Sequence, residues 1–173
     1  AICVFRVSGK GCLDALSKLF SSELAEPRYF YKTKMLNKGA FIDSVAVVFF
    51  KGPKSYTGED SFEVYAHGGL AVMSKIVEVF DAVGFKEAQP GEFSKRAFLN
   101  NKISLSQAEA VSDLISASSK EEASRVSLVL SGDFESRVFD FSGQLDALRV
   151  LVEGEIDFTD EDEVFIQNLE GLG

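Results

Sequence analysis

The spacing of the hydrophobic residues changes at Pro90, and this change constrains the fold more than any other feature of the sequence. Before Pro90, short β-branched and aromatic runs are separated by turn residues, which is typical of strands. These runs cover residues 2–7, 28–36, 41–50 and 61–66. After Pro90, apolar residues recur every three or four positions, which is typical of helices. We therefore expect an α+β domain over residues 1–103 and a helical segment over residues 104–173.

The first part combines a hairpin with strand–helix steps. The runs 28–36 and 41–50 flank the sequence NKG at 37–39, where glycine can supply the positive φ of a tight turn. Helical spacing predicts two helices, one over residues 13–20 and one over residues 70–83. Strands and helices mixed in this way indicate the α+β class.

After Pro90, a short helix is predicted over Glu92–Leu99, before the boundary at 103/104. Asn100 and Asn101 should stop it, because asparagine tolerates the left-handed backbone conformation better than most residues. The sequences SQAE at 106–109 and SKEE at 119–122 are capping boxes that should begin two further helices. The buried stripe of the first of these helices is predicted to be Ala108, Val111 and Ile115.

A long helix with a heptad pattern follows Gly132. Its apolar residues, spaced alternately by four and three positions, should form a seam that needs partner helices: Phe134, Val138, Phe141, Leu145, Leu148 and Val152. We expect this seam to be exposed or paired between chains. Residues 153–173 hold eight acidic residues and no Lys or Arg, so the helix should end near Asp157 and an acidic connector should follow.

Charge and composition exclude several classes of protein. The net charge of −9 is divided unevenly, with +1 over residues 1–117 and −10 over residues 118–173. This distribution argues against the chain alone holding a nucleic acid backbone. No apolar run reaches the roughly 20 residues of a membrane span. Two cysteines are too few for a disulfide framework, so we expect a reducing, cytoplasmic environment.

Catalytic motifs are scarce. The sequence holds no G-x-x-x-x-G-K-[ST] phosphate-binding loop and no G-x-S-x-G nucleophile elbow. The lone histidine, His67, precedes two glycines in a turn, where a structural role is expected. The basic and aromatic run RYFYKTK at 28–34 could stack on RNA, although one strand of a hairpin is the simpler interpretation. No catalytic residue and no metal site is predicted.

Three charged residues stand in unusual places: Arg6 at the end of an apolar strand, Glu63 within SFEVYA, and Lys102 after Asn100-Asn101. They could be ordinary solvated or ion-paired charges. They could also form a site for a ligand with ring N–H donors and carboxylates, because a carboxylate accepts two parallel N–H bonds and Arg or Lys binds an acidic group. Residue types alone leave both interpretations open.

A set of motifs, in order, resembles a known family. GPKSYTGED, then Glu63 four positions before HGG, then PGEFSKRAFLNNK, QAEAVSDLI and EIDFTDED closely resemble the bacterial tRNA-modification GTPases of the MnmE (TrmE) family. The resemblance extends from Ile2 to about Asp162. It implies an N-terminal α+β domain similar to the folate-binding domain of the glycine-cleavage aminomethyltransferase, which binds 5-formyltetrahydrofolate and forms a homodimer. It also implies a following helical domain into which a GTPase domain is inserted.

The resemblance further implies an activity for the whole protein. Its GTPase domain would use GTP, K+ and Mg2+, and lies outside this sequence. With an FAD-dependent partner called MnmG or GidA, the protein would modify C5 of the wobble uridine, position 34, of certain tRNAs with an aminomethyl-type group. This chain alone should not hydrolyse GTP. A stand-alone folate-dependent one-carbon transferase and a non-catalytic helical assembly module are the alternatives.

The family's folate contacts fall on the three unusual charges. An Arg in the strand before Ser-Gly corresponds to Arg6, a Glu before His-Gly-Gly to Glu63, and a Lys after the RAFLN motif to Lys102. The resemblance thus implies that Glu63 binds the amino edge of the pterin, and that Arg6 and Lys102 bind polar and acidic groups. The sequence departs from the family at Asn101, where many members have Gly, and in the segments expected before Arg6 and after the helices.

Overall fold

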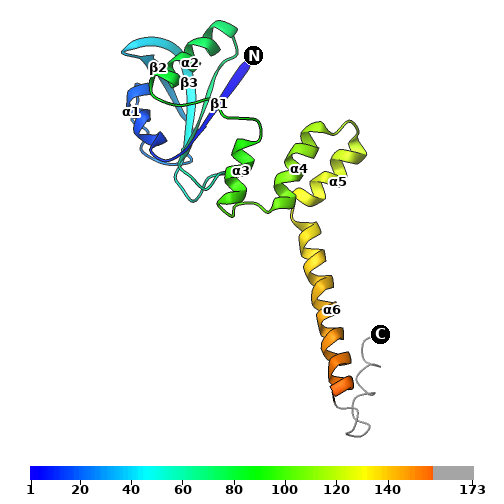
Figure 1. Cartoon of the computed structure of the whole chain (residues 1–173). Coiled ribbons are helices and arrows are strands. Elements are labelled where there is room, and N and C mark those ends of the chain that lie inside the picture. The colour runs from blue at the N-terminus through cyan, green and yellow to red at the C-terminus, as the bar shows by residue number, and fades with distance from the viewer. Residues whose placement is uncertain (158–173) are drawn as a thin grey trace. The chain divides into compact units, whose positions relative to one another are not determined.

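The computed structural model describes residues 1–157, which fall into two compact units that divide between Ser112 and Asp113 (Figure 1). The first unit contains a four-stranded antiparallel sheet in the order β1-β4-β3-β2. Its strands are β1 (Ile2–Ser8), β2 (Tyr31–Asn37), β3 (Ala40–Phe50) and β4 (Ser61–His67). Together with its helices, this sheet confirms the α+β class. The likeness to the aminomethyltransferase and the domain boundary at 103/104 stay predictions.

The hairpin between β2 and β3 forms as the sequence predicts. Asn37 pairs with Ala40, which leaves Lys38 and Gly39 as a two-residue turn. Both turn residues have positive φ, 47° and 86°, and this is the geometry that matches the twist of the flanking strands.

The core lies on one face of the sheet. Helix α2 (Leu70–Ala82) contributes Ile76, Val79 and Phe80 and contacts β3 and β4. The helix predicted over residues 13–20 instead divides into a short 3₁₀ turn, η1 (Cys12–Ala15), and α1 (Leu16–Leu19). The fully buried strand residues are Met35, Val45, Val47, Phe62 and Val64. Each such side chain stabilises the fold by about 1.5–3 kcal/mol when it leaves water.

The opposite face of the sheet carries Arg6 and Glu63. Alternation along β1 exposes Ile2, Val4 and Arg6 and turns the residues between them toward the core. The register of the β1–β4 pair sets Arg6 directly opposite Glu63. Local alternation and strand pairing together therefore bring two distant charges to one place.

Helix α3 (Glu92–Leu99) has the predicted bounds, and Asn101 adopts the left-handed φ of 53° expected of a helix stop. The capping box of α4 (Leu105–Ser116) begins at Ser104, whereas the prediction placed it at Ser106. The backbone N–H of Gln107 donates to Ser104 Oγ at 3.1 Å, and the N–H of Ser104 donates to Gln107 Oε1 at 3.0 Å. The box begins two residues earlier than predicted because Ser104 and Gln107 form the same motif.

The predicted stripe of α4 is also partly wrong. Ile115 is 82% exposed, whereas Ala110 is the buried residue of this helix. Helix α5 (Lys120–Leu130) has the predicted cap, since Ser119 Oγ accepts the N–H of Glu122 at 3.1 Å.

Helix α6 (Asp133–Asp157) follows Gly132, whose φ is 84°. The six predicted seam residues are 47–61% exposed, which confirms the expected exposure. Their pairing between chains stays a prediction. Residues 158–173, which hold most of the predicted acidic connector and the end of the family motif EIDFTDED, lie outside the described residues.

Within residues 1–157, no helix is long and apolar enough to cross a membrane. The same stretch holds no group of three His, Cys, Asp or Glu side chains arranged to bind a metal ion.

Candidate ligand-binding site

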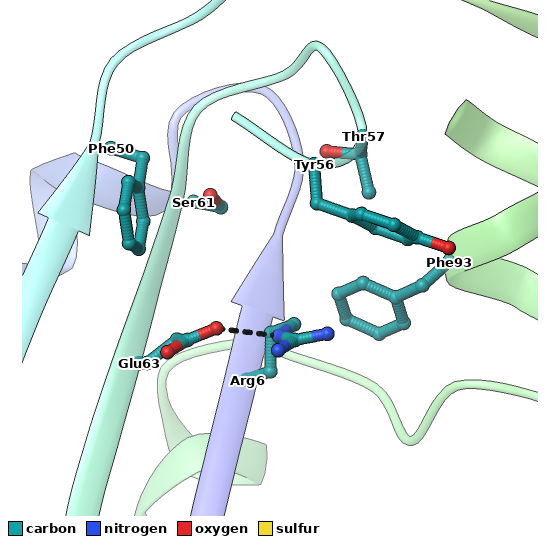
Figure 2. A pocket seen from close by; sticks show the side chains of 7 residues that line it. All are labelled: Arg6, Phe50, Tyr56, Thr57, Ser61, Glu63 and Phe93. Carbon is teal, nitrogen blue, oxygen red and sulfur yellow. Dashed lines mark hydrogen bonds and ion pairs between the residues drawn. The ribbon is translucent and has the colours of Figure 1, made fainter. Parts of the chain in front are cut away.

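A cavity of about 130 Å³ lies on the face of the sheet that carries Arg6 and Glu63 (Figure 2). The cavity is built by neighbouring ends of β1, β3 and β4, by the loop of residues 51–60, and by the first turn of α3. The lining side chains are Arg6, Phe50, Tyr56, Thr57, Ser61, Glu63 and Phe93. Its volume is below the roughly 300 Å³ of the smaller pockets that hold drug-sized ligands. The cavity therefore has room for one ring system of a ligand rather than for a ligand with a long tail.

The charged pair at the floor of the cavity is tightly hydrogen-bonded. Arg6 Nε donates to Glu63 Oε1 at 2.7 Å (Figure 2), and the hydroxyl of Tyr65 donates to Glu63 Oε2 at 2.6 Å. The hydrogen bond to Glu63 raises the pKa of Tyr65, because it favours the protonated hydroxyl. Both oxygens of the Glu63 carboxylate are thus engaged by donors of the chain itself.

Two aromatic rings form the wall of the cavity. The guanidinium carbon of Arg6 lies 5.9 Å from the ring centroid of Tyr56 and 5.9 Å from that of Phe93. These distances allow cation–π attraction. The Tyr56 hydroxyl and Ser94 Oγ are 3.1 Å apart, so the loop ring is tied to the helix that carries the other ring. We call Tyr56 and Phe93 the ring wall.

Side chains of β1 and of the segment after α3 hold the loop of residues 51–60 in place by hydrogen bonds. Thr57 is only 1% exposed, and its hydroxyl lies 2.6 Å from Ser8 Oγ at the end of β1. The side-chain amide of Asn100 donates to the Thr57 carbonyl at 2.7 Å. These bonds satisfy buried polar groups, which would otherwise be costly. The loop therefore holds Tyr56 in one place.

Arg96 ties α3 to the same loop. Its guanidinium donates to Glu59 at 3.1 Å and to Glu92 on the preceding turn of the helix, and it lies 3.4 Å from the carbonyl of Ser8. Hydrogen bonds to Glu92 and Glu59 raise the pKa of Arg96. The network connects the helix of Phe93 to the loop of Tyr56, so it sets the geometry of the ring wall.

Lys102 lies against the loop and outside the cavity lining. Its Nζ donates to the carbonyl of Pro53 at 3.1 Å. Its side chain also runs beside Gly58, where a Cβ would come within 3.3 Å of Lys102 Cγ and Cδ. The structure thus brings Arg6 and Glu63 together in the cavity and attaches Lys102 to the loop that carries Tyr56. Ligand binding by these three residues stays a prediction.

Sequence reasoning missed the ring wall. Both rings lie within motifs quoted above, Tyr56 in GPKSYTGED and Phe93 in PGEFSKRAFLNNK. An aromatic residue in the middle of a Gly-rich polar turn was the available signal, because a solvated turn has no packing need for a large ring.

His67 is hydrogen-bonded to Asp43, and its structural role stays a prediction. Its Nδ1 lies 2.7 Å from Asp43 Oδ1, and its backbone N–H donates to Asp43 Oδ2 at 2.9 Å. Burial alone would raise the pKa of Asp43, but these bonds and one from the N–H of Ser44 outweigh it and lower that pKa. The pair joins β3 to the end of β4.

The fold and the site define a class of protein. Its members have an α+β domain with a charged, ring-lined cavity on the sheet face opposite the core, followed by helices. Residues 1–102 match the family described as the GTP-binding protein TrmE N-terminus. The chain belongs to this family.

Three similar proteins are called tRNA modification GTPase MnmE. The one from Coxiella burnetii (strain RSA 493 / Nine Mile phase I) is 41% identical over 95% of this chain and 36% of the relative. The one from Bordetella avium (strain 197N) is 41% identical over 96% and 38%, and the one from Nitrosococcus oceani is 40% identical over 96% and 36%. This chain therefore spans little more than a third of the relatives it matches.

Proposed function

We propose that this portion of the protein binds 5-formyltetrahydrofolate, with the pterin ring in the cavity. The observation that supports this most is the placement of Arg6 and Glu63 opposite one another, inside a cavity walled by two aromatic rings. A carboxylate can accept two N–H bonds from the amino edge of a pterin, and rings can stack on its faces. The glutamate tail of the ligand extends from the cavity, where Arg6 and Lys102 bind its polar and acidic groups.

A titration of this chain with 5-formyltetrahydrofolate tests the site directly. Glu63→Gln keeps the shape of the side chain but removes the charge and one acceptor, so we expect at least about a tenfold loss of affinity. Lys102→Ala should weaken the tailed ligand by about two- to fivefold, as an exposed ion pair does. Glu78→Gln, an exposed carboxylate on α2, is the matched control. Equal affinity of the wild type and Glu63→Gln would overturn the assignment.

We further propose the whole protein's activity. It hydrolyses GTP with K+ and Mg2+ in a domain outside this sequence, and acts in the cytoplasm as a homodimer joined through the N-terminal domain. With the FAD-dependent MnmG (GidA) partner it modifies C5 of the wobble uridine, position 34, in tRNA. The names of the relatives support GTP hydrolysis and tRNA modification. This assignment predicts that the full-length protein releases phosphate from GTP and this chain does not. GTP hydrolysis by the purified chain, or none by the full-length protein, would contradict it.

A further inference from the structure

The planar guanidinium group of Arg6 lies in the cavity lining. The Arg6 guanidinium lies against both rings of the ring wall, at 5.9 Å from each centroid, and it donates to Glu63 at 2.7 Å. Figure 2 shows Arg6 directed toward Glu63 on one side and toward Phe93 on the other. The side chain of Arg6 is about half exposed, at 49%, so it can leave the cavity without disturbing the core.

A guanidinium has the same hydrogen-bonding groups as the amino edge of the pterin ring that we propose binds here. It is a flat carbon bonded to three nitrogens, it donates N–H bonds to carboxylates, and it stacks on aromatic faces. A 2-amino-4-oxopyrimidine ring contains the same N–C–N unit, closed into a cycle and carrying an exocyclic amino donor. A cavity that holds one of these groups against rings and a carboxylate has the features needed to hold the other.

We propose that Arg6 is an internal surrogate for the ligand's cyclic guanidine unit, and that binding exchanges one for the other. The incoming ring takes the place of the guanidinium at Glu63 and against Tyr56 and Phe93. The released Arg6 is then free to meet the polar or acidic part of the same ligand. This inference rests on the proposed function and adds to it a specificity-determining role for the ring wall and a gating role for Arg6.

The exchange makes opposite predictions for two ligands. For a tail-less ring such as 6-methyltetrahydropterin, Arg6 only competes, so Arg6→Met should bind it more tightly. The gain should be roughly two- to fivefold, because a half-exposed ion pair contributes little. For tailed 5-formyltetrahydrofolate, the same variant also loses a contact to the ligand, so its affinity should not rise.

The ring wall should matter for both ligands. Tyr56→Leu and Phe93→Leu should each weaken binding of the tail-less ring by about fivefold or more, which is the lower end of stacking contributions. Phe98→Leu is the matched control, since Phe98 lies on the same helix as Phe93 but outside the cavity lining. Circular dichroism and thermal unfolding of each variant establish that it folds.

Calorimetric titration of the wild type and these variants with both ligands tests the exchange. Tighter binding of 6-methyltetrahydropterin by Arg6→Met, and weaker binding by the two ring-wall variants, is the expected result. If both ligands bind the wild type, while Arg6→Met weakens the tail-less ring and the two ring-wall variants are weakened more than Phe98→Leu, the exchange is wrong and the folate site stands. If only the tail-less ring binds, and Arg6→Met binds it more tightly than the wild type does, the exchange stands and the folate assignment fails. Failure of every variant to bind the tail-less ring would overturn the exchange.

Discussion

Gly58 is the position where a single methyl group should disturb both the stability of the domain and the candidate site. Its φ of +79° lies in the left-handed region, and a Cβ there would lie 3.1 Å from Asn100 Cβ and 3.3 Å from two carbons of Lys102. Asn100 cannot move away freely, because its side-chain amide donates to the Thr57 carbonyl. Gly58→Ala therefore combines backbone strain with a steric conflict.

The magnitude follows from three contributions. Left-handed backbone costs an L-residue about 1–2 kcal/mol, and alanine returns about 0.4–1 kcal/mol by restricting the unfolded chain. Overpacking adds about 1–3 kcal/mol. We expect Gly58→Ala to lower the free energy of unfolding by about 2–3 kcal/mol. Gly39→Ala has a similar φ of +86° with no atom within 4 Å, so it should lower that energy by only about 1 kcal/mol.

Urea denaturation followed by circular dichroism measures both variants, and the difference between them isolates the steric contribution. Gly58→Ala should also weaken binding of 5-formyltetrahydrofolate, because the displaced loop carries Tyr56. Gly39→Ala should leave that affinity unchanged. Equal losses of stability for the two variants would refute the steric reasoning.

Three further measurements follow from local chemistry. Burial, aided by Asp60, raises the pKa of the Cys12 thiol from 9.0 to about 11. The unfolded chain therefore loses this proton first, and urea titrations should show about 2–3 kcal/mol of stability lost between pH 9 and pH 11 that Cys12→Ala does not lose. Asp43 has a lowered pKa, so its contribution is present above its ordinary pKa of 3.8 and is lost as the pH falls through the folded value. Thermal melts of Asp43→Asn should accordingly show lower stability at neutral pH and a weaker acid dependence, and an unchanged acid dependence would contradict this. Ser104→Ala should lower the free energy of unfolding in urea by about 1 kcal/mol, and Ser106→Ala should lower it by less. A larger loss for Ser106→Ala would instead support the cap predicted at Ser106.

Local sequence determined most of the elements. The turn at Lys38-Gly39, the helix stop at Asn101 and the cap at Ser119 each depend on neighbours within a few positions, so their chemistry can be read directly from the chain. Period-two alternation likewise places Arg6 and Glu63 on the sheet face opposite the core. Such features are predictable because their energies are local.

Local patterns gave a wrong prediction where two assignments fit the sequence almost equally well. SxxQ at 104–107 and SxxE at 106–109 both form capping boxes, and the helix uses the earlier one. The apolar spacing of Ile115 indicated burial, although its side chain is 82% exposed. A stripe predicts which residues share a helix face, but only packing decides how much of that face is covered.

The sequence by itself therefore determined an α+β domain followed by helices, and it singled out three charges. Only the tertiary structure decided which of them meet. The β1–β4 register, set by side chains packed across the whole sheet, places Arg6 against Glu63. The fold of the loop at 51–60 then ties Tyr56 to the helix of Phe93 and holds Lys102 against the loop, outside the cavity lining. These contacts join residues 38 to 57 positions apart, and no local pattern encodes such distances.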